Sequence, residues 1–196
     1  HNRCRRQRQM CIRDSHKSSI FLKNLEIASH VTNDIFKDSN FPDLDGDSLI
    51  DYLESFKMPP GRGEILSLNK IKIIDDSYNA NPESVRAALD HLNSFKEHRK
   101  FFVFGDMKEL GNNEESFHAA VGQYAVGKAD IFFTVGKLAE NAQSNSNNFA
   151  LSLHFNDNFS LLEKLNELLT DGDIVLIKGS RSMQLDQLIN ELKNVK

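Results

Sequence analysis

Short apolar runs alternate with longer amphipathic stretches over the last two thirds of the chain, and few folds are compatible with this alternation. The apolar runs predict strands at Ile71–Ile74, Phe101–Phe104, Ile131–Val135, Leu151–Phe155 and Ile174–Ile177. The longer stretches carry apolar residues at helical spacing, in stripes that begin at Val85, Phe117, Leu161 and Leu185. Because consecutive strands joined by helices require right-handed crossovers, the pattern predicts an α/β fold with a mostly parallel sheet.

We expect this doubly wound, Rossmann-like sheet, with helices on both faces, to occupy residues 61–196. Its proposed start follows Met58-Pro59-Pro60-Gly61, where two prolines and a glycine stop a helix and mark a hinge. Residues 16–60 are predicted to be helical, because apolar residues recur at helical spacing near Ile20 and again from Leu49 to Phe56. Within the sheet domain, Asn81 and Pro82 are a predicted N-cap and first turn, and residues 141–148 are predicted to form a polar loop.

The first fifteen residues differ from the rest in charge and cysteine content. They hold five Arg, one Asp and both cysteines, Cys4 and Cys11, whereas the rest of the chain is acidic. A basic arm, a targeting peptide and a disordered tail are open readings of residues 1–15, and we interpret the segment as a non-native tail. A cysteine-free, acidic body excludes a disulfide scaffold, argues against nucleic-acid binding and fits the cytosol. No apolar stretch approaches the roughly 18 residues of a membrane span.

Polar residues follow the predicted strands where the chain leaves them. The first strand runs into Asp75-Asp76-Ser77-Tyr78-Asn79-Ala80-Asn81, the second into Gly105-Asp106-Met107-Lys108-Glu109, and the fifth into Lys178-Gly179-Ser180-Arg181. In open parallel sheets, ligands bind beyond the carboxyl ends of the strands. Each segment alone is typical of an ordinary turn. Their coincidence on one rim, with two of them leading into helix N-termini, predicts a carboxylate or phosphate ligand there.

The order of these motifs resembles the C-terminal domain of the Mur ligases. The resemblance rests on GRGE at 61–64, IDDSYNANPESV at 74–85, FGDMKELG at 104–111, His118 and KGSRSM at 178–183. Within that family, the combination of DDSYNANP with GDMKELG resembles the ligases that add D-alanyl-D-alanine to UDP-N-acetylmuramoyl-tripeptide during peptidoglycan synthesis. The resemblance implies an ATP- and Mg²⁺-dependent enzyme, in which ATP activates a carboxylate as an acyl phosphate and an amine then attacks it. It also implies a cytoplasmic monomer.

The resemblance implies roles in nucleotide binding for two residues. Arg62 resembles the family arginine that contacts ATP after the interdomain hinge, and a guanidinium suits phosphate geometry. Asp76 resembles the acid that accepts hydrogen bonds from the ribose. Lys108 and Glu109 are weaker candidates for the site.

Further roles, in binding the incoming dipeptide, follow from the same motifs. Asn79 and Asn81 resemble residues that shape its site, and Ser180 and Arg181 are candidates for binding its free carboxylate. Lys178 has two open readings, since it either helps there or braces the loop.

The sequence departs from the whole family pattern in one respect. No G-x-x-x-x-G-K-[ST] phosphate-binding loop is present among the 196 residues, and the carboxylates that hold Mg²⁺ in the family's central domain are missing. Residues 16–60 resemble only the last helices of that domain. We therefore expect no catalytic residue in this chain, which we interpret as an inactive fragment, with ATP and Mg²⁺ bound mainly upstream.

Three alternatives remain open from the sequence. A phospho-receiver would use Asp75, Asp76, Asp106 and Lys178, but its accepting acid should end the third strand and Asp106 ends the second. A dinucleotide-binding module should carry G-x-G-x-x-G after the first strand, and the chain has none there. A stand-alone binding or regulatory domain with the same fold is the third.

Overall fold

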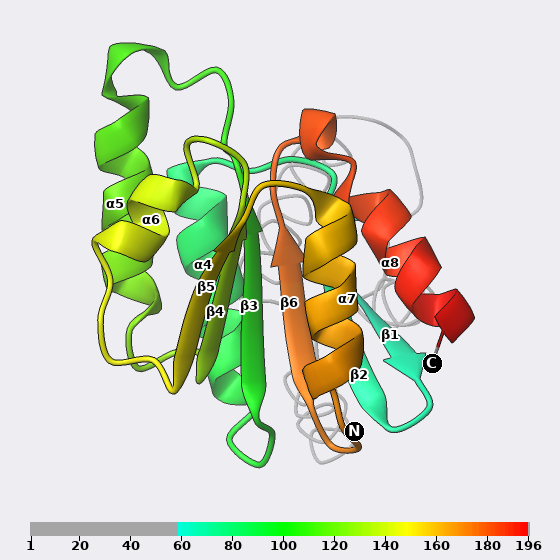
Figure 1. Cartoon of the computed structure of the whole chain (residues 1–196). Helices are drawn as coiled ribbons and strands as arrows, with labels where there is room; N and C mark the ends of the chain where they lie inside the picture. The colour runs from blue at the N-terminus through cyan, green and yellow to red at the C-terminus, as the bar shows by residue number, and fades with distance from the viewer. Residues whose placement is uncertain (1–58, 196) are drawn as a thin grey trace, which may run out of the picture. The chain divides into compact units, whose positions relative to one another are not determined.

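The structure, a computed structural model, describes residues 59–195, and these form a unit built on one six-stranded sheet (Figure 1). The strands are β1 (Glu64–Leu68), β2 (Ile71–Asp76), β3 (Lys100–Gly105), β4 (Ile131–Val135), β5 (Leu151–Phe155) and β6 (Ile174–Lys178). Their order in the sheet is β1-β2-β6-β3-β4-β5. All neighbouring strands are parallel except β1, which pairs with β2 in the antiparallel sense. The expected mostly parallel α/β sheet is confirmed.

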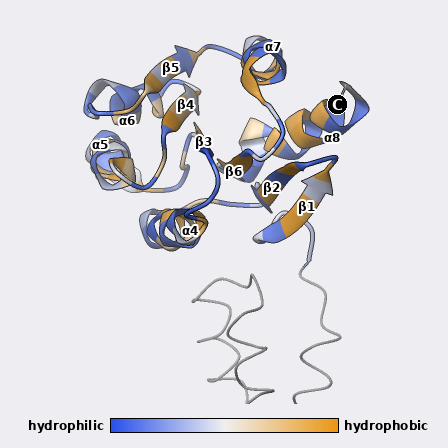
Figure 2. Cartoon of the chain, turned by 90° about the horizontal axis from the view of Figure 1, so that it is seen from below, coloured by the Kyte–Doolittle hydropathy of each residue, from blue (hydrophilic) through white to orange (hydrophobic). Residues whose placement is uncertain are grey.

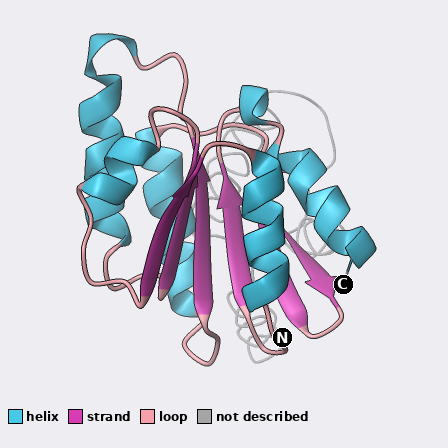
Figure 3. Ribbon diagram, viewed as in Figure 1, coloured by secondary structure: helices cyan, strands magenta, loops and turns pink. Residues whose placement is uncertain are grey.

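Helices cover both faces of this sheet (Figure 3). They are α4 (Pro82–Ser94), α5 (Glu114–Ala125), α6 (Glu140–Ser144), α7 (Asn158–Leu168) and α8 (Leu185–Val195). Buried residues of α4, α5 and α6 pack on one face, and those of α7 and α8 pack on the other. The view along the strands shows this division and the apolar colour of the central strands (Figure 2). All four helices that the apolar stripes predicted are present.

The core is aromatic at its centre. β3, β4 and β6 are buried along almost their whole length, as the apolar runs predicted. The parallel register places Phe101 beside Ile131 and Phe102 beside Phe132. The rings of Phe102 and Phe132 stack with centroids 5.2 Å apart on the face that α4 and α5 cover. Strands buried on both faces are typical of a parallel sheet with helices on each side.

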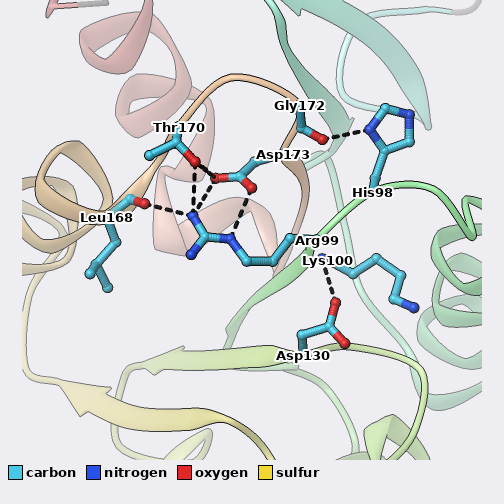
Figure 4. Close-up of polar contacts among 8 residues, drawn as sticks. All are labelled: His98, Arg99, Lys100, Asp130, Leu168, Thr170, Gly172 and Asp173. Atoms are coloured by element: carbon cyan, nitrogen blue, oxygen red, sulfur yellow. Dashed lines mark hydrogen bonds and ion pairs between the residues drawn. The ribbon is translucent and has the colours of Figure 1, made fainter.

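The amino-terminal edge of the sheet is fastened by a polar network (Figure 4). Arg99, just before β3, donates from Nε and Nη2 to the two carboxylate oxygens of Asp173, just before β6, at 2.9 and 2.7 Å. Its Nη2 also donates to the carbonyl of Leu168 at the end of α7. The Lys100 amide donates to Asp130, which precedes β4. These contacts join the segments that lead into β3, β4 and β6, so we assign this edge of the sheet a structural role. The polar loops lie at the opposite edge.

One strand, one α-helix and two short 3-10 helices, η1 (Gly111–Asn113) and η2 (Arg181–Met183), were not predicted from the sequence. β1 lies in the stretch that follows the hinge, where its residues are only partly buried at the sheet edge. The expected loop at 141–148 is wrong in its first half, because α6 occupies Glu140–Ser144. α6 buries only small residues, Ala139 just before it and Ala142 within it, and therefore has no apolar stripe to recognise.

The predicted helices of 16–58 and the tail at 1–15 lie outside the described residues. No helix within 59–195 combines the length and apolarity needed to cross a membrane.

Candidate functional site

The loops that follow β2, β3, β4 and β6 meet at the carboxyl edge of the sheet, as expected from their parallel pairing. β2 and β6 are neighbours, so Asp76 lies opposite Lys178 in the register. β3 is the other neighbour of β6 and brings Gly105 and Asp106 to the same place. The rim therefore collects three of the sequence motifs into one region.

Lys178 is the most deeply buried charged residue at this rim, with 1% of its surface exposed. Its Nζ donates to Asp76 Oδ2 at 2.6 Å and to the carbonyl oxygen of Asn79 at 3.0 Å. A buried ammonium requires such partners, because an unpaired buried charge is costly. Lys178 thus braces the loop between β2 and α4. It orients Asp76 through one carboxylate oxygen and leaves Oδ1 of Asp76 without a partner among the described residues.

The side chains of the two asparagines of that loop accept hydrogen bonds from backbone amides nearby in the chain. Asn79 Oδ1 accepts from the Ala80 amide at 2.8 Å. Asn81 is the N-cap of α4, as predicted, and its side chain and that of Ser84 exchange hydrogen bonds with each other's backbone amides. Both asparagines are exposed, and within residues 59–195 their side chains make hydrogen bonds only through Oδ1, which leaves their NH₂ groups without a partner there. These groups are the donors that this loop offers to a ligand.

Arg62 lies on the turn that precedes β1, and this turn packs against the loop after β2. The Tyr78 amide donates to the Gly61 carbonyl at 2.9 Å, and the Gly63 amide donates to the Asp75 carbonyl at 2.7 Å. The guanidinium of Arg62 lies over the ring of Tyr78, 4.0 Å from its centroid. A cation over an aromatic face is attracted by the ring quadrupole. The structure therefore brings Arg62 to the loop that carries Asp76 and adds Tyr78, which sequence reasoning did not select.

Gly61 makes this close approach possible. Its φ is +75°, and a Cβ at this position would lie 3.1 Å from the Tyr78 backbone nitrogen and 3.2 Å from the Tyr78 Cβ. Glycine adopts such a φ without steric cost and has no side chain to collide. A tyrosine inside an otherwise polar turn was the signal in the sequence that could have pointed to this contact, and in the structure its side chain is 45% exposed.

A second group of buried polar side chains ties the loop after β3 to its neighbours. Asp106 is 3% exposed, and its Oδ1 accepts from the Leu138 and Ala139 amides at 2.9 and 2.8 Å. Its Oδ2 pairs with Lys108 at 2.8 Å. The Ser180 amide donates to the Asp106 carbonyl. Asp106 therefore joins three loops: its carboxylate binds the loop after β4, and its backbone carbonyl binds the loop after β6.

Ser180 and His118 hold the next two residues of the same loop. The Lys108 amide donates to Ser180 Oγ, and the Met107 amide donates to His118 Nε2, both at 2.8 Å. His118 Nδ1 lies 2.6 Å from the Glu114 carbonyl, which requires its proton on Nδ1. Burial lowers the pKa of His118, against a smaller opposing effect of the Glu114 carbonyl. The hydroxyl of Ser180 is thus placed inside the rim, where it holds Lys108, whereas Arg181 is exposed.

A cleft of about 310 Å³ opens beside these loops. It is lined by Pro60, Gly61, Asp75, Ser77, Tyr78, Arg181 and Asp186. Arg181 Nη1 pairs with Asp186 Oδ2 at 2.8 Å on its wall. The hinge turn, the loop after β2 and the start of α8 therefore share one concave surface.

The fold and the loops of the rim together indicate a class of binding domain. The rim is the carboxyl edge of a mostly parallel α/β sheet, where such domains bind ligands, and it carries two arginines and amide donors of a kind that suits anionic groups. Among the described residues, no group of three His, Cys, Asp or Glu is placed to hold a metal ion. Asp106 is buried with both oxygens occupied, which gives no support to a phospho-receiver.

Residues 61–181 match the family model described as Mur ligase, glutamate ligase domain, and the chain belongs to the Mur ligase family. It is 35% identical over 147 residues to the UDP-N-acetylmuramoyl-tripeptide--D-alanyl-D-alanine ligase of Bacillus subtilis, covering 71% of this chain and 32% of that protein. It is 33% identical over 145 residues to the Escherichia coli ligase of the same name, covering 72% and 31%. The chain thus spans about a third of the length of these relatives.

Solved structures agree with the sequence comparison. A crystal structure of MurF ligase from Thermotoga maritima in complex with ADP superposes with a TM-score of 0.66 and 29% identity, covering 74% of this chain and 33% of that one. A MurF structure from Acinetobacter baumannii gives a TM-score of 0.70 and 27% identity, covering 76% and 34%. The sequence resemblance to this family is confirmed, and so is the fold that it implied.

Proposed function

We propose that this chain is the C-terminal part of an ATP-dependent ligase that joins D-alanyl-D-alanine to UDP-N-acetylmuramoyl-tripeptide in peptidoglycan precursor synthesis. The observation that carries the proposal is the rim itself: the motifs that resemble this branch of the family lie together at one edge of the sheet. The named relatives in Bacillus subtilis and Escherichia coli support the choice of dipeptide. The activity belongs to the whole ligase, and this domain contributes binding groups.

In this proposal Arg62 and Asp76 contact the nucleotide. Arg62 is an exposed guanidinium fixed over Tyr78, and a guanidinium matches phosphate oxygens through paired N–H donors. Asp76 offers to ribose hydroxyls its Oδ1, which has no partner in the described part of the chain, while Lys178 holds its other oxygen. The ADP bound to the Thermotoga maritima relative supports a nucleotide as the ligand of this family. Mg²⁺ would neutralise phosphoryl charge, and the carboxylates to hold it belong to the proposed upstream domain.

The amine substrate is proposed to bind along the same rim. Among residues 59–195, the NH₂ groups of Asn79 and Asn81 have no partner, and the guanidinium of Arg181 is engaged through one nitrogen only. Ser180 and Lys178 act indirectly, because their polar atoms already hold Lys108 and the loop after β2. Such chemistry depends on positioning an amine against an activated carboxylate, so rigid loops contribute to the rate.

The test is the DNA sequence upstream of codon 16, read across that junction from genomic DNA. The proposal expects the reading frame to continue into a G-x-x-x-x-G-K-[ST] loop and a domain for the UDP-sugar. A frame that truly starts with the Arg-rich segment would contradict the catalytic proposal. A stand-alone binding or regulatory domain would then replace it.

A further inference from the structure

Strand β5 is the last strand of the sheet, and among the described strands it pairs only with β4. In the view along the strands it lies at one end of the sheet, between α6 and α7 (Figure 2). All of its residues are partly exposed, whereas those of β4 are buried. The outer side of β5 is therefore the side at which a further strand can add to the sheet.

The backbone groups on this outer side belong to Ser152 and His154. In a parallel pair, alternate residues of a strand direct both their N–H and their C=O to the neighbouring strand. The Phe155 carbonyl accepts from the Gly136 amide, just after β4, at 3.4 Å. The odd-numbered residues of β5 therefore face β4, and Ser152 and His154 direct their N–H and C=O groups away from the sheet. Within residues 59–195, these four groups have no hydrogen-bond partner.

The sequence of β5 contains none of the usual devices that protect an edge strand. Native proteins often place Lys, Pro or an inward-pointing charge on an open edge, because unpaired backbone groups there pair with other chains. The stretch 150–156 (ALSLHFN) contains no Asp, Glu, Lys, Arg or Pro. The strand at the opposite edge, β1, begins at Glu64 and lies between Arg62 and Lys70. The edge at β5 is thus the one suited to pairing.

A second copy of β5, in the antiparallel sense, fits this edge. A two-fold axis through Leu153 places Ser152 of each copy opposite His154 of the other. In an antiparallel ladder, residues opposed in this way exchange both of their N–H···O=C bonds, so this register uses all four outward groups of each copy. Leu153 then lies opposite its own counterpart in the closer type of pair, with Cα atoms about 4.5 Å apart.

The side chains of β5 match under the same operation. Leu151, Leu153 and Phe155 pack on the core at the face that α7 covers, and Ser152 and His154 point to the other face because successive side chains of a strand alternate. This alternation is the same when β5 is read in either direction. The axis therefore places apolar residues beside apolar ones on one face and polar residues beside polar ones on the other. A shift by one residue would oppose the two faces.

We propose that two copies of this chain associate through β5 in this antiparallel register, which joins their two six-stranded sheets into one. The interface is isologous, since the same strand serves both copies. A strand of five residues buries little surface, so we expect a weak dimer with a dissociation constant on the order of 0.3 mM. The resemblance to the Mur ligases implies a monomer, so this association is a property of the particular sequence of β5.

The proposed dimer leaves both candidate functional sites open. Because the two β5 strands run in opposite directions, the carboxyl rims of the two sheets lie at opposite ends of the dimer. The inference is therefore independent of the proposed function, and either can fail without the other.

Amide hydrogen exchange on the ¹⁵N-labelled 196-residue chain tests the register directly. Between about 50 μM and about 2 mM protein, the exchange of the Ser152 and His154 amides should slow by about threefold, as the monomer fraction falls. The Leu153 amide faces β4 and is the internal reference, which should be protected equally at both concentrations. Concentration-independent exchange of Ser152 and His154 would overturn the proposal.

Two variants of Ser152 test whether the outward amide carries the association. Ser152→Pro removes an outward N–H, leaves the bonds to β4 in place and is of a kind that outer strands tolerate. In sedimentation velocity its dimer dissociation constant should rise about tenfold or more. Ser152→Ala is the matched control, since it keeps the amide and removes a hydroxyl that has no partner among the described residues. It should leave the dissociation constant unchanged.

The outcomes with these variants separate β5 from any other surface of the chain. Self-association that Ser152→Pro leaves unchanged would locate the interface elsewhere and overturn the proposal. Weakening by Ser152→Pro and Ser152→Ala alike would show that the amide is not responsible, with the same consequence. The exchange measurement on the natural chain decides the matter if the proline variant fails to fold.

Discussion

Replacement of His118 should separate a hydrogen-bond role from simple packing. His118 is fully buried and accepts the Met107 amide, while its Nδ1–H is directed to the Glu114 carbonyl. In His118→Leu the Met107 amide would be buried without an acceptor, which costs about 1–3 kcal/mol. Loss of the ring contact with Phe104, 5.6 Å between centroids, adds to this cost. We expect the free energy of unfolding to fall by about 2–4 kcal/mol.

His118→Gln is the matched variant, because a glutamine oxygen can accept the same amide. It should lose about half as much as His118→Leu. The measurement is urea unfolding followed by NMR signals of residues 59–195, so that the unit at 1–58 does not enter the result. Equal losses for the two variants would refute the hydrogen-bond role.

The stabilisation that His118 contributes should depend on pH, in a direction that its pKa shift determines. Burial lowers the pKa of His118, so below the ordinary histidine pKa of about 6.5 the unfolded chain binds a proton that the folded chain does not. The stabilisation from neutral His118 is therefore complete above about pH 6.5 and is lost as the pH falls towards the folded pKa. The advantage of the natural protein over His118→Gln should shrink between pH 7.5 and 5.5. A constant difference across that range would contradict the assignment of a neutral, buried imidazole.

Three further substitutions test other contacts through the same unfolding measurement. Lys178→Met leaves Asp76 without its buried partner and should cost about 3 kcal/mol, whereas a loss below about 0.5 kcal/mol would show that the pair contributes little. Gly122→Ala places a Cβ 2.0 Å from the Ala142 carbonyl, so it should cost more than about 3 kcal/mol by separating α5 from α6, and a neutral result would contradict that packing. Asn81→Ala removes the N-cap of α4 and should cost about 1 kcal/mol, while unchanged stability would mean that the cap is not formed in solution.

The sheet and its main helices were predictable because burial leaves a pattern in the sequence. β3, β4 and β6 are apolar throughout since helices cover both of their faces. β1 escaped prediction because an edge strand is half exposed and needs no continuous apolar run. α6 escaped because it packs through alanines against a glycine, and small residues carry no amphipathic signal.

The position of the site in the fold was predictable from the sequence, but the partner that each side chain binds was not. The sequence placed Asp76 and Lys178 on one rim, but only the register of β2 and β6 shows that they pair. Lys178 is buried and paired because it contacts Asp76, a residue 102 positions away in the chain. Tyr78 and Asp75 needed the packing of the hinge turn to appear as parts of a cleft. Motif identity locates a site, and tertiary contacts decide which atoms remain available to a ligand.

A ligation assay on the protein encoded by the complete reading frame tests directly whether this domain belongs to a D-alanyl-D-alanine-adding ligase. UDP-N-acetylmuramoyl-tripeptide, D-alanyl-D-alanine, ATP and Mg²⁺ are mixed with it, and the UDP-linked product is identified by mass spectrometry. We expect a product heavier by one D-alanyl-D-alanine unit, with phosphate release that requires both substrates. ATP turnover with a different amine substrate, or no product when the protein is folded and binds ATP, would contradict it.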